Sequence, residues 1–261
     1  MAKYKKVDTD LKFVDREKEV EKFWKDHDIF KKSIDAQFAF NSEVAGVFDD
    51  MISRSIPGYA SILELTSKAL LGYVPNKGTI TDIGCSTANL LIKIAKEERK
   101  KEFRLIGIDD SGDMLSVASK KAKAYECEIE FLNQNVTTAK LPSSDAFVAN
   151  FTLQFIRPII REKVVENIFS SLNEHGVFLF AEKLISEDKK LNKFLIDSYH
   201  EYKKNMGYSK LEIMRKREAL ENVLVPYSEE ENKEVCLKAG FYRVETLFKW
   251  CNFALFIALK R

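Results

Sequence analysis

The fold of this chain is decided by two neighbouring stretches, Thr79-Ile-Thr-Asp-Ile-Gly-Cys-Ser-Thr-Ala-Asn89 and Arg104-Leu-Ile-Gly-Ile-Asp109. A short β-prone run stops at Gly84, helix-forming residues follow from Asn89, and a second β-prone run ends at Asp109. This order of strand, tight loop, helix, strand and acidic residue is typical of half a nucleotide-binding α/β sheet. We expect Gly84 to let the backbone pass close to a ligand where a Cβ would collide. Asp109, at the carboxyl end of the second strand, is expected to accept both hydroxyls of a ribose.

The loop after the first strand indicates which nucleotide fits. A dinucleotide site requires Gly-x-Gly-x-x-Gly so that a helix N-terminus can meet a pyrophosphate, but Ser86, Ala88 and Asn89 offer no further glycine. A Gly-Lys-Ser/Thr sequence, which would indicate a P-loop, is also missing. Asp82 before the glycine and Asp109 after the second strand fit a ligand with a ribose but no phosphate, and S-adenosylmethionine is the common one. The alternative is a structural βαβ turn with a solvated Asp109.

Length and composition limit the class of protein. A chain of 261 residues suits one large domain, or one domain with an extension. The N-terminus lacks the apolar stretch of a signal peptide, and no apolar run approaches the roughly 18 residues of a membrane span, so we expect a cytoplasmic protein without a membrane partner. A net charge of +2 gives no reason to expect direct tRNA binding. The four cysteines form no Cys-x-x-Cys pair and, with only three histidines, give no zinc spacing, so no metal is expected.

The chain divides into a charged N-terminal extension, residues 1–36, and an α/β domain, residues 37–261. The extension holds ten Lys/Arg and nine Asp/Glu, and a partial apolar stripe predicts one helix over about 15–30. The domain begins with two helices broken at Ile56-Pro57-Gly58, because this sequence forces a turn. Tyr59, just after the turn, could cap a pocket or pack in the core.

The rest of the domain predicts a mostly parallel sheet of seven strands. After the two opening strands, the β-prone runs are Ile129–Leu132, Ala146–Ala149, Val177–Ala181, Phe241–Phe248 and Cys251–Leu259. Asn135, beyond the third strand, could bond the edge of an adenine, and Asn150 ends the fourth strand at the switch point where ligands bind. Gln154 follows closely, with a loop contact as the alternative. A charged helical insert over about 187–222 contains Arg215-Lys-Arg217, which on local pattern alone indicates a solvated basic face.

Longer motifs in the chain resemble those of the carboxy-S-adenosylmethionine synthase family, from about residue 38 to the end. The resemblance implies a Rossmann-like class I S-adenosylmethionine-dependent methyltransferase fold, with a helical N-terminal extension and a helical insert after strand five. In that family S-adenosylmethionine and prephenate become carboxy-S-adenosylmethionine and phenylpyruvate, and the product serves a separate enzyme that carboxymethylates the wobble uridine of certain tRNAs. The motifs are Phe48-Asp-Asp-Met-Ile-Ser-Arg-Ser-Ile-Pro-Gly-Tyr59, Asp82-Ile-Gly-Cys-Ser86, Asn150-Phe-Thr-Leu-Gln-Phe155, Glu182-Lys183, Gly207-Tyr-Ser-Lys-Leu-Glu-Ile213 and Lys216-Arg-Glu-Ala-Leu-Glu-Asn-Val223.

The resemblance also implies a role for each matching position. Arg217 would be the catalytic residue: it would hold the added carboxylate and would reach in from the partner subunit of a homodimer. The chemistry agrees, because a sulfonium acidifies its methyl protons and the resulting ylide can trap carbon dioxide released from prephenate. The new carboxylate then needs a fixed cation, and Arg is a planar bidentate donor. The adenosyl ligand, substrate or product, would be held by Tyr59, Gly84, Cys85, Ser86, Asp109, Asp110, Asn135, Val136 and Asn150.

Two positions depart from the family pattern. Ala88 replaces the glycine usual at the end of the loop and adds a Cβ where the helix starts. Asn135 replaces the usual Asp facing adenine; it keeps an acceptor oxygen but loses the charge. A bond to a charged group is worth roughly 1.5–3 kcal/mol against about 1 for a neutral one, so we expect weaker binding.

Two other functions stay open at this point. The first is an ordinary S-adenosylmethionine-dependent methyltransferase acting on a small molecule or tRNA. It would be favoured if the helix of Arg217, Tyr199 and Tyr202 lay away from the sulfonium. The second is a non-enzymatic ligand-binding or RNA-associated protein that uses residues 1–36.

Overall fold

The computed structural model describes residues 40–97 and 101–261, which belong to the unit Gln37–Arg261. The helix predicted over 15–30 lies outside the described residues. Within them, no helix is long and apolar enough to cross a membrane.

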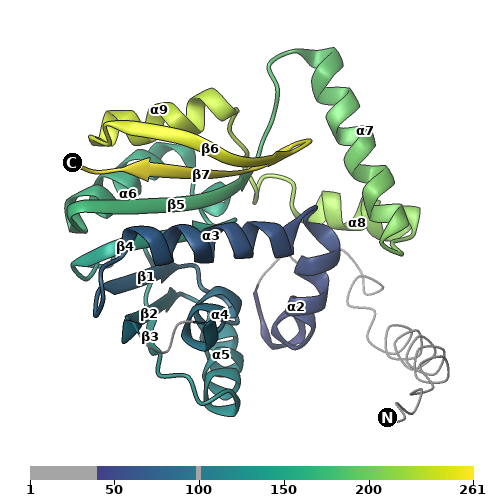
Figure 1. The fold of residues 1–261 in the computed structure, drawn as a ribbon. Helices are drawn as coiled ribbons and strands as arrows, with labels where there is room; N and C mark the ends of the chain where they lie inside the picture. The colour runs from purple at the N-terminus through teal and green to yellow at the C-terminus, as the bar shows by residue number, and fades with distance from the viewer. Residues whose placement is uncertain (1–39, 98–100) are drawn as a thin grey trace, which may run out of the picture. The chain divides into compact units, whose positions relative to one another are not determined.

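Seven strands form one sheet in the order β3-β2-β1-β4-β5-β7-β6 (Figure 1). Every neighbouring pair from β3 to β5 is parallel, whereas β7 runs antiparallel to both β5 and β6. The predicted mostly parallel, seven-stranded sheet is therefore confirmed. Chain order reverses between β1 and β4, and this is the switch point at which such sheets bind ligands. The bounds are β1 Thr79–Ile83, β2 Arg104–Asp109, β3 Glu130–Asn133, β4 Ser144–Asn150, β5 Leu172–Lys183, β6 Arg243–Trp250 and β7 Phe253–Leu259.

Helices cover both faces of the sheet. Apolar residues of α3, α4 and α5 form one buried cluster with the strands, and those of α6 and α9 form another on the opposite face. Local signals fix where these helices begin and end: the Ser111 hydroxyl accepts from the Met114 N–H at the start of α5, and Gly240 (φ 115°) ends α9. The bounds are α3 Tyr59–Tyr73, α4 Asn89–Glu97, α5 Gly112–Ala124, α6 Pro158–Ser171 and α9 Glu229–Ala239.

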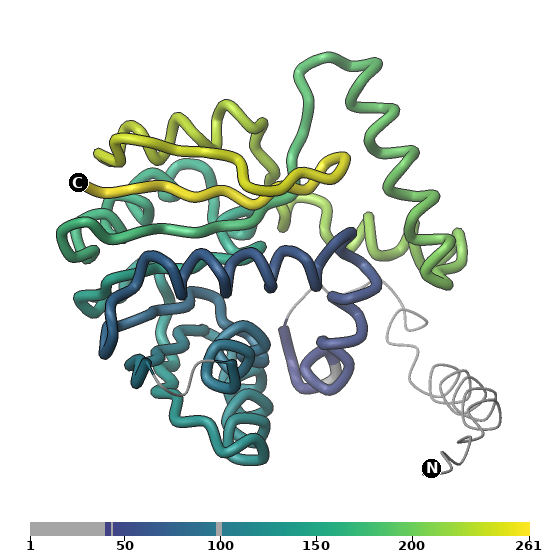
Figure 2. The backbone as a smooth tube through the Cα atoms, viewed as in Figure 1, coloured from purple at the N-terminus to yellow at the C-terminus, as the bar shows by residue number. Residues whose placement is uncertain are grey.

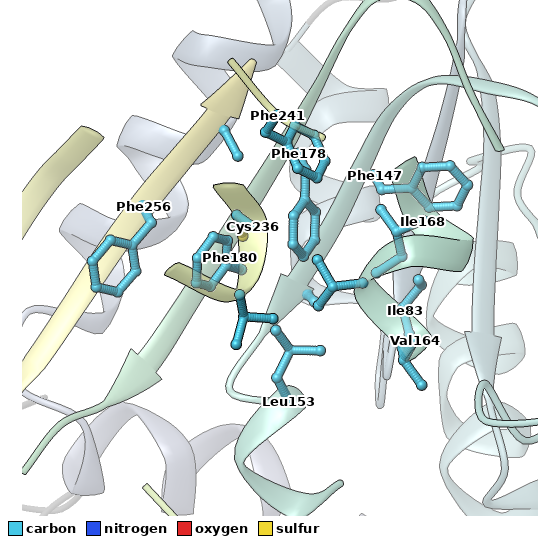
Figure 3. Close-up of a cluster of buried hydrophobic side chains, with 14 of the residues drawn as sticks. Ile83, Phe147, Leu153, Val164, Ile168, Phe178, Phe180, Cys236, Phe241 and Phe256 are labelled. Atoms are coloured by element: carbon cyan, nitrogen blue, oxygen red, sulfur yellow. The ribbon is translucent and has the colours of Figure 1, made fainter. Parts of the chain in front are cut away.

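Aromatic side chains of the central strands fill the second cluster. Phe178 and Phe180 of β5 stack at 4.9 Å between ring centroids, and Phe180 stacks equally close on Phe256 of β7. Figure 3 shows Ile168 of α6 and Cys236 of α9 closing over these rings. Fully burying one such side chain contributes about 1.5–3 kcal/mol. The sheet is thereby a rigid base for the loops at its carboxyl edge.

Three further helices belong to neither face: α2 Ser42–Ser55, α7 Lys189–Asn205 and α8 Lys210–Ala219. The α2–α3 turn is the predicted break at Pro57-Gly58, where Gly58 adopts φ 69° and a Cβ would lie 2.6 Å from the Phe248 ring. The chain leaves β5 for α7, turns at Gly207 into α8, and then returns to α9 (Figure 2). These two helices are the predicted insert after strand five. Helix α7 packs on α2 and α3 through a third cluster that includes Ile56, Tyr199 and Phe253.

Candidate active site

A cavity of about 760 Å³ opens at the carboxyl ends of β1, β2, β4 and β5, beneath α2, α7 and α8. The structure therefore brings together sequence positions that are separated by more than half of the chain. Their roles in binding remain predictions. All ten residues named from the sequence line this cavity: Tyr59, Gly84, Cys85, Ser86, Asp109, Asp110, Asn135, Val136, Asn150 and Arg217.

Asp109 is held at one end of the cavity by two backbone N–H groups. Its Oδ2 accepts from Ser86 N at 2.8 Å and its Oδ1 from Ser111 N at 2.9 Å. Burial raises the pKa of Asp109, and these two hydrogen bonds lower it in part. Each carboxylate oxygen keeps a further lone pair, so the group can still accept two hydroxyls.

Gly84 is required for a reason that sequence reasoning missed. It adopts φ 67°, and a Cβ there would lie 2.4 Å from Oγ1 of Thr152, which donates to the Ile83 carbonyl. A Cβ at position 84 would therefore clash with the chain itself, and the close approach of a ligand to Gly84, which lines the cavity, stays a prediction. In the same loop Ser86 (φ 51°) and Ala88 (φ 60°) are also left-handed. A non-glycine residue in this region costs roughly 1–2 kcal/mol, which accounts for the glycine usual at the position of Ala88.

Asn150, at the end of β4, carries a buried amide whose oxygen and nitrogen both lack a hydrogen-bond partner among the described residues. The side-chain carbonyl oxygen of Asn252, which also lines the cavity, is likewise buried without a hydrogen-bond partner among the described residues. Buried polar groups are paired in the great majority of cases, and an unpaired one costs about 1–3 kcal/mol. A ligand with polar edges, such as S-adenosylmethionine, fits these positions because it can supply the missing partners.

Asn135 differs from its expected geometry. Its Oδ1 accepts from the N–H of Thr137 at 2.9 Å and from the Thr137 hydroxyl at 2.6 Å, and its Nδ2 donates to Asp110 at 3.3 Å. Both lone pairs of the oxygen are therefore used within the chain. The prediction that this oxygen receives the adenine amine is not supported by the structure, although Asn135 and Val136 do line the cavity.

Gln154 makes loop contacts, as the alternative for this residue proposed. Its Nε2 donates to the Phe151 carbonyl at 3.3 Å, and its Oε1 accepts from Lys183 N at 3.1 Å. Next to it, the buried Glu182 carboxylate accepts from the N–H groups of Leu153 and Gln154, both at 2.9 Å. These bonds fix the loop that follows β4.

Tyr59 and Asp82 lie on the wall between α2, α3 and β1. Burial is the main cause that raises the pKa of Tyr59 to about 12, and the Tyr59 hydroxyl accepts from Asn89 Nδ2 at 3.4 Å. Burial, followed by the charge of Asp109, raises the pKa of Asp82 to about 8. At neutral pH this wall therefore presents a phenol and a largely protonated carboxyl.

The opposite end of the cavity is cationic. Lys183 at the end of β5, Lys203 on α7, and Lys216 and Arg217 on α8 all line it. Burial is the main cause that lowers the pKa of Lys203, and likewise of Lys216, to about 7. The lysines were not identified as site residues from the sequence, although the quoted motifs included Lys183 and Lys216; nothing in the charged pattern of the insert distinguished Lys203.

Ser55, the last residue of α2, ties the insert to that helix. The Ser55 carbonyl accepts from the Tyr199 hydroxyl at 2.9 Å, and the Ser55 hydroxyl lies 3.0 Å from that of Tyr208. Lys216 Nζ donates to the Ser55 hydroxyl at 2.7 Å. These bonds place α8, and with it the exposed side chain of Arg217, at the cavity of its own chain. Among the described residues, no group of three or more His, Cys, Asp and Glu could hold a metal ion.

Comparisons of fold define the class of this protein. It resembles an O-methyltransferase family protein from Burkholderia thailandensis, with a TM-score of 0.66 at 14% identity over 93% of this chain and 70% of the other. Human N-acetylserotonin methyltransferase, solved in complex with S-adenosylmethionine, gives a TM-score of 0.61 at 16% identity over 84% of this chain and 55% of that one. A family model for a methyltransferase domain matches residues 80–176. The fold is that of the class I S-adenosylmethionine-dependent methyltransferases.

Sequence relatives are more specific. The chain is 50% identical to the carboxy-S-adenosyl-L-methionine synthase of Nautilia profundicola, over 89% of its own length and 98% of the relative's. It is 51% identical to the synthase of Campylobacter concisus, over 89% of its own length and 99% of the relative's. The chain belongs to the carboxy-S-adenosyl-L-methionine synthase family.

Proposed function

We propose that the protein converts S-adenosyl-L-methionine and prephenate to carboxy-S-adenosyl-L-methionine and phenylpyruvate. The product would supply the carboxymethyl group to a separate tRNA uridine carboxymethyltransferase that modifies the wobble position. The observation that carries the proposal is a single cavity with a nucleoside-type end at Asp109 and a cationic end at Arg217. A methyltransferase that moves an uncharged methyl group has no need of the cationic end.

At the first end, Asp109 would accept the ribose hydroxyls while its two N–H donors keep it in place. The unpaired amide of Asn150 would gain its partners from the ligand. Gly84, Cys85 and Ser86 would form the turn against which the ligand lies. Tyr59 would cover it as a neutral phenol, because its raised pKa excludes the phenolate at physiological pH.

At the second end the reaction moves a carboxylate. Prephenate loses carbon dioxide and hydroxide as its ring becomes aromatic, and phenylpyruvate remains. The hydroxide and one proton of the sulfonium methyl form water, and the methyl carbon forms a bond to the carbon dioxide. Arg217 would stabilise the carboxylate that develops there, since a fixed bidentate donor favours the charged product.

We also propose a cytoplasmic homodimer in which Arg217 is donated across the interface. Four large apolar side chains of α7 and α8 are exposed by 48–63%, and such groups are suited to an interface. Because Arg217 also lines the cavity of its own chain, donation within one chain is the competing arrangement. The four apolar side chains are Leu191, Phe194, Leu211 and Met214.

We further propose that residues 1–36 form a separate extension of the α/β domain.

The test is the identity of the product. The purified enzyme is incubated with S-adenosylmethionine and prephenate, and the ligand is weighed by mass spectrometry. We expect a species heavier by one carboxylate, formed together with phenylpyruvate. Asp109→Ala should abolish its formation, whereas Asp113→Ala, an exposed change in the next helix, should not. Transfer of an unmodified methyl group with no carboxylated species would replace this proposal by the ordinary methyltransferase.

A further inference from the structure

Two lysine ammonium groups line the cavity without a counter-ion. Lys183 and Lys203 form no ion pair with any carboxylate in residues 40–97 and 101–261, and the Lys203 side chain is almost fully buried. Both lie beside one ring: Lys203 Nζ is 4.4 Å and Lys183 Nζ is 5.2 Å from the centroid of Tyr199. A ring face attracts a cation but does not neutralise it.

Such an arrangement is unfavourable in the protein alone. Burial lowers the pKa of both lysines, and the charge of Lys183 lowers that of Lys203 further. Arg217 on α8 faces the same space with the same sign of charge. Burial and the nearby cations lower the pKa of His200 on α7, which also lines the cavity, so its imidazole stays neutral and adds no charge. Buried charges are found with partners, and a bound anion is the partner that would relieve this repulsion.

The floor of this pair is rigid. The Tyr199 hydroxyl is fixed on the Ser55 carbonyl, and its ring packs edge-on against Phe253 with centroids 5.0 Å apart. The lysines come from different elements, since Lys183 ends β5 and Lys203 lies on α7. A site held in place before the ligand arrives loses little entropy when the ligand binds.

We propose that Lys183 and Lys203 bind the 2-oxo-acid carboxylate that the second substrate keeps throughout the reaction. This inference rests on the proposed function. Of the two carboxylates of prephenate, one is transferred and one stays in phenylpyruvate, so the cavity has to hold two negative charges at different places. Arg217 serves the transferred carboxylate, and the lysine pair beside Tyr199 serves the retained one.

The two subsites can be separated by ligands that carry only one of the two carboxylates. Phenylpyruvate carries the retained group and carboxy-S-adenosylmethionine carries the transferred one, and both affinities can be measured by calorimetry without turnover. Lys203→Met or Lys183→Met should weaken the binding of phenylpyruvate, and raise the KM for prephenate, by at least about tenfold, as expected for a lost charge-assisted contact. Their affinity for carboxy-S-adenosylmethionine should change less than about twofold. Arg217→Ala should give the opposite pattern.

Lys204→Met is the matched control, because it is the exposed neighbour on the same helix and should change neither affinity. Lys203→Arg keeps a cation and should retain part of the phenylpyruvate affinity, which separates lost charge from lost packing. The inference is wrong if both methionine variants bind phenylpyruvate as the parent does, or lose both ligands equally while folded. If the parent makes no carboxylated product from prephenate, the proposed function fails instead.

Discussion

At the scale of single residues, Asn150 is the most informative position. Its amide is buried and unpaired among the described residues, although the strand that carries it is the centre of the sheet. Such a group costs stability in the free protein and recovers it when a ligand provides partners. Its effects on folding and on binding should therefore have opposite signs.

Asn150→Ala should raise the free energy of unfolding of the free protein by about 1 kcal/mol, because an unpaired amide is removed. The same change should weaken the binding of S-adenosylmethionine and reduce the rise in unfolding temperature that this ligand produces. Thermal unfolding with and without the ligand measures both effects. Destabilisation of the free protein by this variant would show that the amide is satisfied within the chain.

At the scale of elements, the insert decides what the cavity can do. Its helix α8 presents Arg217, and the chain provides two ways to supply it: within one chain or across a dimer. Mixing Arg217→Ala chains with Asp109→Ala chains distinguishes them. Donation across the interface predicts partial recovery of carboxy-S-adenosylmethionine formation, since a mixed dimer then contains one complete site. If the mixture stays inactive while mixed dimers form, Arg217 serves its own chain.

Elements were more predictable than contacts. The strands, the break at Pro57-Gly58 and the ends at Ser111 and Gly240 follow from local sequence, because propensity and capping act over a few residues. The lysine pair could not be predicted, because it depends on α7 folding back over β5. The reason for Gly84 was also missed, because its neighbour Thr152 is distant in sequence. The ten candidate residues came largely from motifs whose meaning the resemblance provided.

At the scale of the whole molecule, the cationic end predicts a dependence on pH. In the free enzyme Lys203 and Lys216 have a pKa of about 7, well below the usual value, mainly because of burial. They are protonated below that pH and lose their charge as the pH rises through it. The kcat/KM for prephenate, which reports groups of the free enzyme, should therefore fall above about pH 7.

Stopped-flow or steady-state rates between pH 6 and 9 (roughly the range around these pKa values) provide the measurement. Lys203→Arg should flatten the decline, because guanidinium stays charged over the whole range. S-adenosylmethionine affinity is the internal control and should not follow the same curve. A kcat/KM that rises through pH 7 to 9 would contradict a role for the protonated lysines.

The extension is the other feature of the whole chain that can be tested. All candidate residues lie between Tyr59 and Arg217, so a protein that begins at Gln37 should turn over within a few-fold of the full chain. The two proteins are compared under identical substrate concentrations. Loss of activity in a shortened protein that keeps its circular dichroism spectrum would place residues 1–36 in the function.

The junction at Ser55 has a consequence for how this sequence can evolve. One small residue serves Tyr199 on α7, Lys216 on α8 and Tyr208 in the turn between these helices, all more than a hundred positions away. A change of the Ser55 hydroxyl removes an acceptor from a buried lysine, and no single neighbouring substitution restores all the contacts. Lineages of this enzyme should therefore change positions 55, 208 and 216 together or not at all.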